Sequence, residues 1–140
     1  MTVSKADAPD TAETRDRCVE FLLELKAEDI QVIDLTGLAD FTDFFIVASG
    51  GSNTHVKAVA DSVLEGMREL GQKPWHREGY DSSKWILLDY VDVVVHVFQR
   101  EVREYYALER LWADAPIETI TDELSDVGEA ASVDADEQEA

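Results

Sequence analysis

Three histidines are the residues of this sequence that could most readily bind a metal or act as a base. His55, His76 and His96 show no i,i+4 spacing, and none has a cysteine or another histidine close to it. Metal-binding motifs need such spacing. His96 lies within a valine-rich run, where a packed, hydrogen-bonded imidazole is commoner than a ligand. The histidines therefore predict neither a metal site nor a cofactor.

Acidic residues offer a second possible chemistry. Glu78 with Asp89 or Asp92 would make an acid–base pair, but carboxylates at exposed turns usually only interact with water and keep the surface solvated. Asp61 lies in a predicted helix and lacks the Asp-x-Asp partner that a nucleotidyltransferase needs to hold magnesium. We find no catalytic constellation and expect a protein that is not an enzyme.

The turn Gly50–Thr54 keeps one alternative open. A glycine- and serine-rich turn before a helix can hold an anion on its free amide groups, as nucleotide-binding proteins do. The turn lacks the spacing of a Walker loop or a dinucleotide fingerprint, and neither Ser49 nor Ser52 lies in a Gly-x-Ser-x-Gly elbow. A nucleotide-binding or nucleotidyltransferase-type protein is therefore the alternative hypothesis.

The charge of the chain restricts its partners. Its 140 residues include 31 acidic and 12 basic ones, which gives a net charge of −19. Residues 116–140 carry nine acids and no base, and residues 18–115 carry eighteen acids against nine bases. Such a surface repels DNA and RNA backbones and favours a basic protein as partner.

The single cysteine and the hydropathy pattern point to a compartment. Cys18 excludes an internal disulfide and suits a reducing environment. Nothing approaches eighteen consecutive apolar residues, and the first residues lack the order of a signal peptide. We expect a cytoplasmic protein without a membrane partner.

Periodicity predicts three helices and five strands. Asp10 and Glu13 have capping-box spacing, which starts a helix over 11–28, and Ser52 is a plausible N-cap for a helix that ends at Gly71. A third helix begins at Glu101. The predicted strands span residues 30–35, 43–49, 73–77, 84–89 and 92–99, the last two as an antiparallel hairpin.

These elements predict one α/β domain. The order α-β-β-α-β-β-β-α implies a mixed five-stranded sheet flanked by helices. We assign residues 1–10 to a flexible N-terminus, 11–115 to the domain and 116–140 to an acidic tail, which has too few large apolar groups to order itself.

Both faces of the predicted hairpin are apolar. Trp85 and Leu87 point to one face, and Ile86 and Leu88 point to the other. Either the three helices divide between the faces and bury everything, or one face keeps an apolar patch for a partner or a second copy. The sequence favours neither alternative.

Four blocks of sequence, in order and spacing, resemble the Iojap-related ribosomal silencing factors. They are Asp43–Gly50, Ser52–Asp61, Glu78–Gly79 with Trp85–Tyr90, and Val94–Phe98 with Arg103–Trp112. One position departs from the family pattern: Val91 stands where the family usually has glycine, so the resemblance does not extend to the geometry of that turn.

The resemblance implies a fold and a function. The expected fold is a mixed α/β domain with a nucleotidyltransferase-like core and no enzyme activity. The expected partner is ribosomal protein fourteen of the large subunit. Binding there is expected to block joining of the small subunit and to lower translation when nutrients are short. A homodimer is expected off the ribosome. The candidate partner-binding residues are Glu78, Trp85, Leu87, Asp89, Tyr90 and Asp92.

Overall fold

The computed structural model describes residues 10–121, and its two long helices begin at side-chain caps. Helix α2 spans Thr11–Glu24, and Asp10 accepts the amide N–H of Glu13 at 2.8 Å. Helix α3 spans Asn53–Glu69, and Ser52 accepts the amide N–H of His55 at 3.1 Å. Both predicted caps are confirmed, because each oxygen satisfies an amide that has no partner inside its helix.

The strands form one mixed sheet in the order β3-β4-β5-β2-β1-β6. β2 and β5 pair in parallel at its centre, and every other neighbouring pair is antiparallel. The predicted hairpin of β4 and β5 is confirmed. The strands are β1 (Glu28–Asp34), β2 (Phe44–Gly50), β3 (His76–Glu78), β4 (Trp85–Asp89), β5 (Val93–Gln99) and β6 (Ile117–Thr119).

The predicted number of five strands was wrong. Ile117–Thr119 pairs with β1 as a sixth, edge strand, within the segment assigned to the acidic tail. Hydrogen bonds on either side fix this segment, from Asp34 N–H to the Pro116 carbonyl and from Ile120 N–H to the Ile30 carbonyl, both 2.9 Å. The tail beyond residue 121 lies outside the described residues.

Two predicted helices have different bounds in the structure. α2 ends at Glu24 rather than near residue 28, and Lys26 turns the chain toward β1 with a φ of +61°. The third predicted helix divides into α4 (Arg100–Tyr106) and α5 (Leu108–Leu111). Ala107 separates them, because its φ of +47° cannot continue a right-handed helix.

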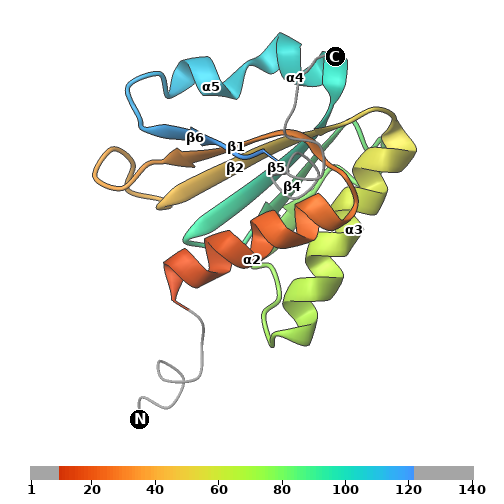
Figure 1. The fold of residues 1–140 in the computed structure, drawn as a ribbon, viewed down its shortest axis with the longest axis horizontal. Helices are drawn as coiled ribbons and strands as arrows, with labels where there is room; N and C mark the ends of the chain where they lie inside the picture. Colours follow the sequence, from red (N-terminus) through yellow and green to blue (C-terminus); the bar gives the residue numbers. More distant parts are fainter. Residues whose placement is uncertain (1–9, 122–140) are drawn as a thin grey trace, which may run out of the picture.

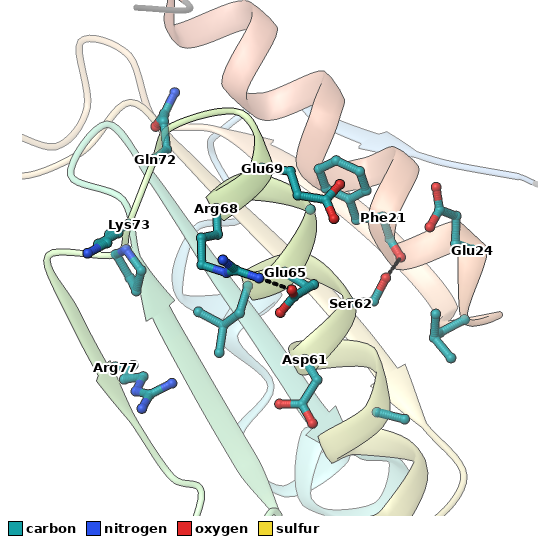
Figure 2. Close-up of a pocket in the computed structure, with 15 residues that line it drawn as sticks. Phe21, Glu24, Asp61, Ser62, Glu65, Arg68, Glu69, Gln72, Lys73 and Arg77 are labelled. Atoms are coloured by element: carbon teal, nitrogen blue, oxygen red, sulfur yellow. Dashed lines mark hydrogen bonds and ion pairs between the residues drawn. The ribbon is translucent and has the colours of Figure 1, made fainter.

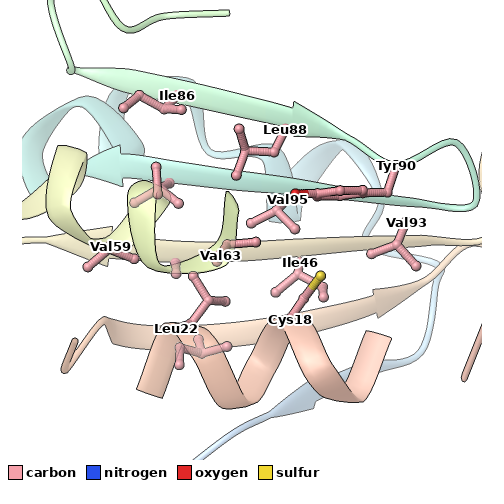
Figure 3. Close-up of a cluster of buried hydrophobic side chains, with 14 of the residues drawn as sticks. Cys18, Leu22, Ile46, Val59, Val63, Ile86, Leu88, Tyr90, Val93 and Val95 are labelled. Atoms are coloured by element: carbon pink, nitrogen blue, oxygen red, sulfur yellow. The ribbon is translucent and has the colours of Figure 1, made fainter. Parts of the chain in front are cut away.

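The helices divide between the two faces of the sheet (Figure 1). α2 and α3 cover one face over the main hydrophobic core, which Figure 3 shows. The short helices α4 and α5 lie over the other face. They leave β4 partly uncovered there, since Trp85 and Leu87 stay half-buried while Ile86 and Leu88 are fully buried. The structure therefore has the incompletely covered face that the sequence allowed.

Candidate functional site

Four of the predicted partner-binding residues gather on the incompletely covered face. Directly opposed residues of antiparallel strands share a face, and Glu78 of β3 is opposite Leu87 of β4. Trp85 and Asp89 lie two residues to either side of Leu87 and therefore share its side of the sheet. We call these four residues, Glu78, Trp85, Leu87 and Asp89, the open sheet face.

The other two predicted residues do not belong to this surface. Tyr90 is 7% exposed and lies in the main core with Ile86 and Leu88, toward α2 (Figure 3). Burial raises the pKa of its hydroxyl above the ordinary value. Asp92 accepts a hydrogen bond from the Thr11 hydroxyl at the start of α2, at 3.2 Å. The structure thus places Tyr90 and Asp92 beside α2.

Trp85 is the large side chain of the open sheet face. Its indole ring stacks on Phe98, with ring centroids 4.8 Å apart and planes at 26°. On α4, Tyr106 lies with its ring centroid also 4.8 Å from Trp85. The indole N–H donates to Nδ1 of His96 at 3.1 Å. These contacts hold the ring at the surface while leaving part of it exposed.

His96 lies beneath this surface, opposite Leu87 on β5. It is 3% exposed, and burial lowers its pKa to about 4, so the ring is neutral at pH 7. Because an indole N–H can only donate, Nδ1 accepts and the proton of the neutral ring lies on Nε2. The sequence-based interpretation of His96 as a packed, hydrogen-bonded histidine is confirmed.

A tight turn fixes where β4 begins. Gly79 has a φ of +97°, and a Cβ at this position would overlap the backbone carbonyl of Trp85. The following residue, Tyr80, donates its hydroxyl to Asp61 of α3 at 2.9 Å. The segment between β3 and β4 is thereby anchored on both sides, which sets the position of Glu78 relative to Trp85.

A buried arginine holds α4 against the sheet. Arg103 is 7% exposed and donates to the backbone carbonyl of Asp29 at 2.6 Å and to the Ser49 hydroxyl at 2.8 Å. Its Nε donates to Glu109 of α5 at 3.0 Å. These bonds join both short helices to β1 and β2, and so place Tyr106 beside Trp85.

Exposed aromatic rings border the other end of the same side of the sheet. Phe41, which is 60% exposed, lies with its ring centroid 6.0 Å from Phe45 and 6.2 Å from Trp112. The Phe45 ring contacts His96 edge-on, with centroids 4.5 Å apart. Buried Phe45 and His96 therefore connect the exposed Phe41 ring to Trp85 on the same side of the sheet.

The turn Gly50–Thr54 has local structural roles. The Gly51 amide donates to Nδ1 of His55 at 3.1 Å, and Nε2 of the same ring lies 2.8 Å from the Leu25 carbonyl. A Cβ at Gly50 would lie 3.0 Å from Val56. His55 thus already accepts the Gly51 amide N–H that an anion would need. Gly50 permits the close packing of β2 against α3.

A groove of about 940 Å³ lies on the helix side of the sheet, between α2, α3 and the segment before β3 (Figure 2). Acidic and basic side chains line it together, among them the ion pair of Arg68 and Glu65. None of the six predicted residues lines it. Within residues 10–121, no three His, Cys, Asp or Glu residues are grouped to hold a metal ion, and no helix has the length and apolar character needed to cross a membrane.

Comparison with known proteins decides the family. The model of the family described as ribosomal silencing factor during starvation matches residues 8–140. The chain belongs to this family. A ribosomal silencing factor of Bacillus subtilis is 41% identical over 92 residues, which cover 66% of this chain and 78% of the relative.

Two further proteins are similar to this chain. A crystal structure of a protein from Chromobacterium violaceum, 39% identical, superposes with a TM-score of 0.73 over 75% of this chain and 88% of its own. A mouse protein named for mitochondrial assembly of the ribosomal large subunit is 30% identical over 115 residues, or 80% of this chain and 49% of its own. The family's name describes regulation of the ribosome.

Proposed function

We propose that this protein silences the large ribosomal subunit by occlusion. It binds ribosomal protein fourteen of that subunit through the open sheet face, blocks joining of the small subunit and lowers translation when nutrients are limiting. Family membership supports this role, as does the large-subunit name of the mouse relative. Occlusion needs a complementary surface and no reacting group.

The half-exposure of Trp85 and Leu87 is the observation that carries the proposal. Along β4, buried and half-buried residues alternate, and the half-buried ones on the open face include two large apolar side chains. Large aromatic residues at the centre of an interface typically contribute most of its binding energy. Glu78 is exposed, and with Asp89 it supplies carboxylates for the lysines and arginines of a basic ribosomal protein.

Binding to ribosomal subunits tests this surface. Trp85→Ala is expected to weaken binding to purified large subunits about thirtyfold or more, equivalent to about 2 kcal/mol. Ile86→Ala is the matched control, because its side chain points into the opposite core and its loss lowers stability instead. A folded Trp85→Ala protein that binds large subunits normally would move the interface away from Trp85.

The net charge of −19 provides a second test. If carboxylates attract a basic partner, raising the salt concentration slows association more than it speeds dissociation. Stopped-flow measurement with large subunits at several salt concentrations separates the two rates. An association rate that is indifferent to salt would remove electrostatic attraction from the proposal.

Self-association belongs to the same proposal. The open sheet face is apolar enough to meet a second copy, which gives the homodimer that the resemblance implies. A second copy and the ribosome would then compete, so dilution to the monomer should raise the apparent affinity for large subunits. Sedimentation of the wild type and of Leu87→Asp tests this, since an added charge on a dimer interface favours the monomer.

Nucleotide binding is the competing hypothesis. It requires the nucleotidyltransferase-like core to bind a phosphate at Gly50–Thr54, where His55 already accepts the Gly51 amide. Titration with ATP and magnesium is therefore expected to give no saturable signal. Saturable binding that is lost in Ser52→Ala would favour the nucleotide-binding alternative.

A further inference from the structure

Three side chains restrain the Trp85 indole. Phe98 stacks on the ring, Tyr106 packs against it, and His96 accepts its N–H at 3.1 Å. The two aromatic neighbours restrict the tilt of the ring but do not select its in-plane direction, because stacking has no donor or acceptor. The hydrogen bond to His96 is directional, and it holds the N–H edge of the indole inward.

His96 is a costly residue for this position. It occupies the fourth position of a strand whose other six residues are Val, Val, Val, Val, Phe and Gln, and the surrounding cluster on this side is apolar. Its Nε2 atom is buried and has no hydrogen-bond partner among residues 10–121. Burying an unsatisfied donor costs about 1–3 kcal/mol. An apolar residue would avoid this penalty but would leave the indole N–H of Trp85 without its acceptor, so the gain from histidine here lies in holding Trp85.

We propose that His96 is a positioning residue for docking: by accepting the Trp85 N–H, it fixes the indole in the orientation that the large-subunit partner meets. The inference rests on the proposed function, because it assigns Trp85 to the interface. Holding a side chain in its bound orientation removes part of the ordering cost of association. Without the acceptor, the indole N–H would have to turn toward water, and the apolar edge of the ring would leave the surface.

Two substitutions separate the acceptor from the bulk of the ring. His96→Phe keeps an aromatic ring and removes the acceptor, whereas His96→Asn keeps an acceptor oxygen close to the position of Nδ1. Val59→Ala, on the buried side of α3 in the opposite core, controls for a general loss of stability. Each variant is measured in two ways, by affinity for purified large subunits and by the Trp85 indole resonance of the free protein.

The free protein gives the direct readout. Its three tryptophans give three indole N–H resonances, and Trp85→Phe identifies the one from Trp85. We expect His96→Phe to shift this resonance and to speed its exchange with water at least tenfold, with Val59→Ala leaving it in place. We expect affinity to fall about tenfold in His96→Phe, to be largely restored in His96→Asn and to be unchanged in Val59→Ala.

The outcomes distinguish this inference from the proposed function. The positioning role would be overturned if the Trp85 indole N–H resonance in His96→Phe neither shifted nor exchanged faster with water. Equal losses of affinity in His96→Phe and His96→Asn would overturn it as well. A shifted indole with normal affinity would retain the hydrogen bond but overturn its role in docking, whereas normal binding by Trp85→Ala would overturn the proposed function itself. If His96→Phe does not fold, the wild-type protein decides: ¹⁵N spectra must show His96 with its proton on Nε2, and a proton on Nδ1 refutes the inference.

Discussion

The backbone carbonyl of Trp85 lies directly against Gly79, in space that any side chain at residue 79 would fill. Gly79→Ala therefore has two penalties, since it overlaps this carbonyl and places a Cβ on a left-handed backbone. We expect a loss of about 3 kcal/mol in the free energy of unfolding, together with weaker binding to large subunits. Chemical denaturation measures the first effect.

Gly71 is the matched control for Gly79. Its φ of +85° is similar, but a Cβ there would meet nothing within 4 Å. Gly71→Ala is expected to cost about 1 kcal/mol, because only the backbone penalty remains. Equal losses in the two variants would show that the contact with Trp85 does not matter.

Val91 is expected to be a weak point of the hairpin. It has a φ of +76°, where a β-branched residue is strained. Val91→Gly should raise the free energy of unfolding by about 1 kcal/mol, the relief of strain exceeding the entropic cost of glycine. Val91→Ala should bring no comparable gain. Thermal melting tests both, and a lower melting temperature for Val91→Gly would refute the assignment of strain.

His96 should make stability depend on pH. Burial lowers its pKa from 6.5 to about 4, so the unfolded chain binds the proton more readily than the folded protein does. Stability is therefore complete above about pH 6.5 and declines as the pH falls toward 4. The contribution of this residue is about 3 kcal/mol over that window.

The carboxylates also titrate at low pH, so the effect of His96 is read as a difference. The free energies of unfolding of wild type and His96→Asn are compared at pH 7 and pH 4.5 by urea denaturation. The wild type should lose more stability than the variant on acidification. Equal losses of stability in the wild type and in His96→Asn would show that unfolding does not protonate His96 between pH 7 and pH 4.5.

Two truncations test the sixth strand. Removing residues 122–140 should change the free energy of unfolding by less than about 1 kcal/mol, as expected for a segment with few large apolar groups. Removing residues 117–140 should cost about 2 kcal/mol more, because it also deletes the β6 hydrogen bonds to β1. A large loss in the shorter truncation would instead show that the acidic tail packs on the domain.

Local patterns predicted most of the fold because they are repeated within each element. Apolar spacing and the Ser52 cap identified α3, and the short turn between two apolar runs identified the β4–β5 hairpin. Strand β6 was missed because three exposed residues in an acidic context carry no alternating signal. Its pairing with β1, more than eighty residues away in sequence, is a tertiary contact.

The site was predicted in part for a similar reason. Alternation along β4 correctly placed Trp85 and Leu87 together, and the same alternation places Tyr90 with Ile86 and Leu88 in the core. The burial of Tyr90 could therefore have been predicted from the sequence. The bond from Trp85 to His96 joins diagonal positions on two strands and depends on the hairpin register and on side-chain rotamers, which the sequence does not specify.

The state of Cys18 has a practical consequence for measuring these effects. It is the sole cysteine of the chain and lies fully buried on the core-facing side of α2, where burial raises the pKa of its thiol to about 12. Thiol-directed dyes react with the thiolate, so native protein should remain unlabelled at neutral pH. A cysteine introduced at exposed Asp81, in the turn that precedes β4, would then accept a single fluorophore, and its emission could follow docking in real time.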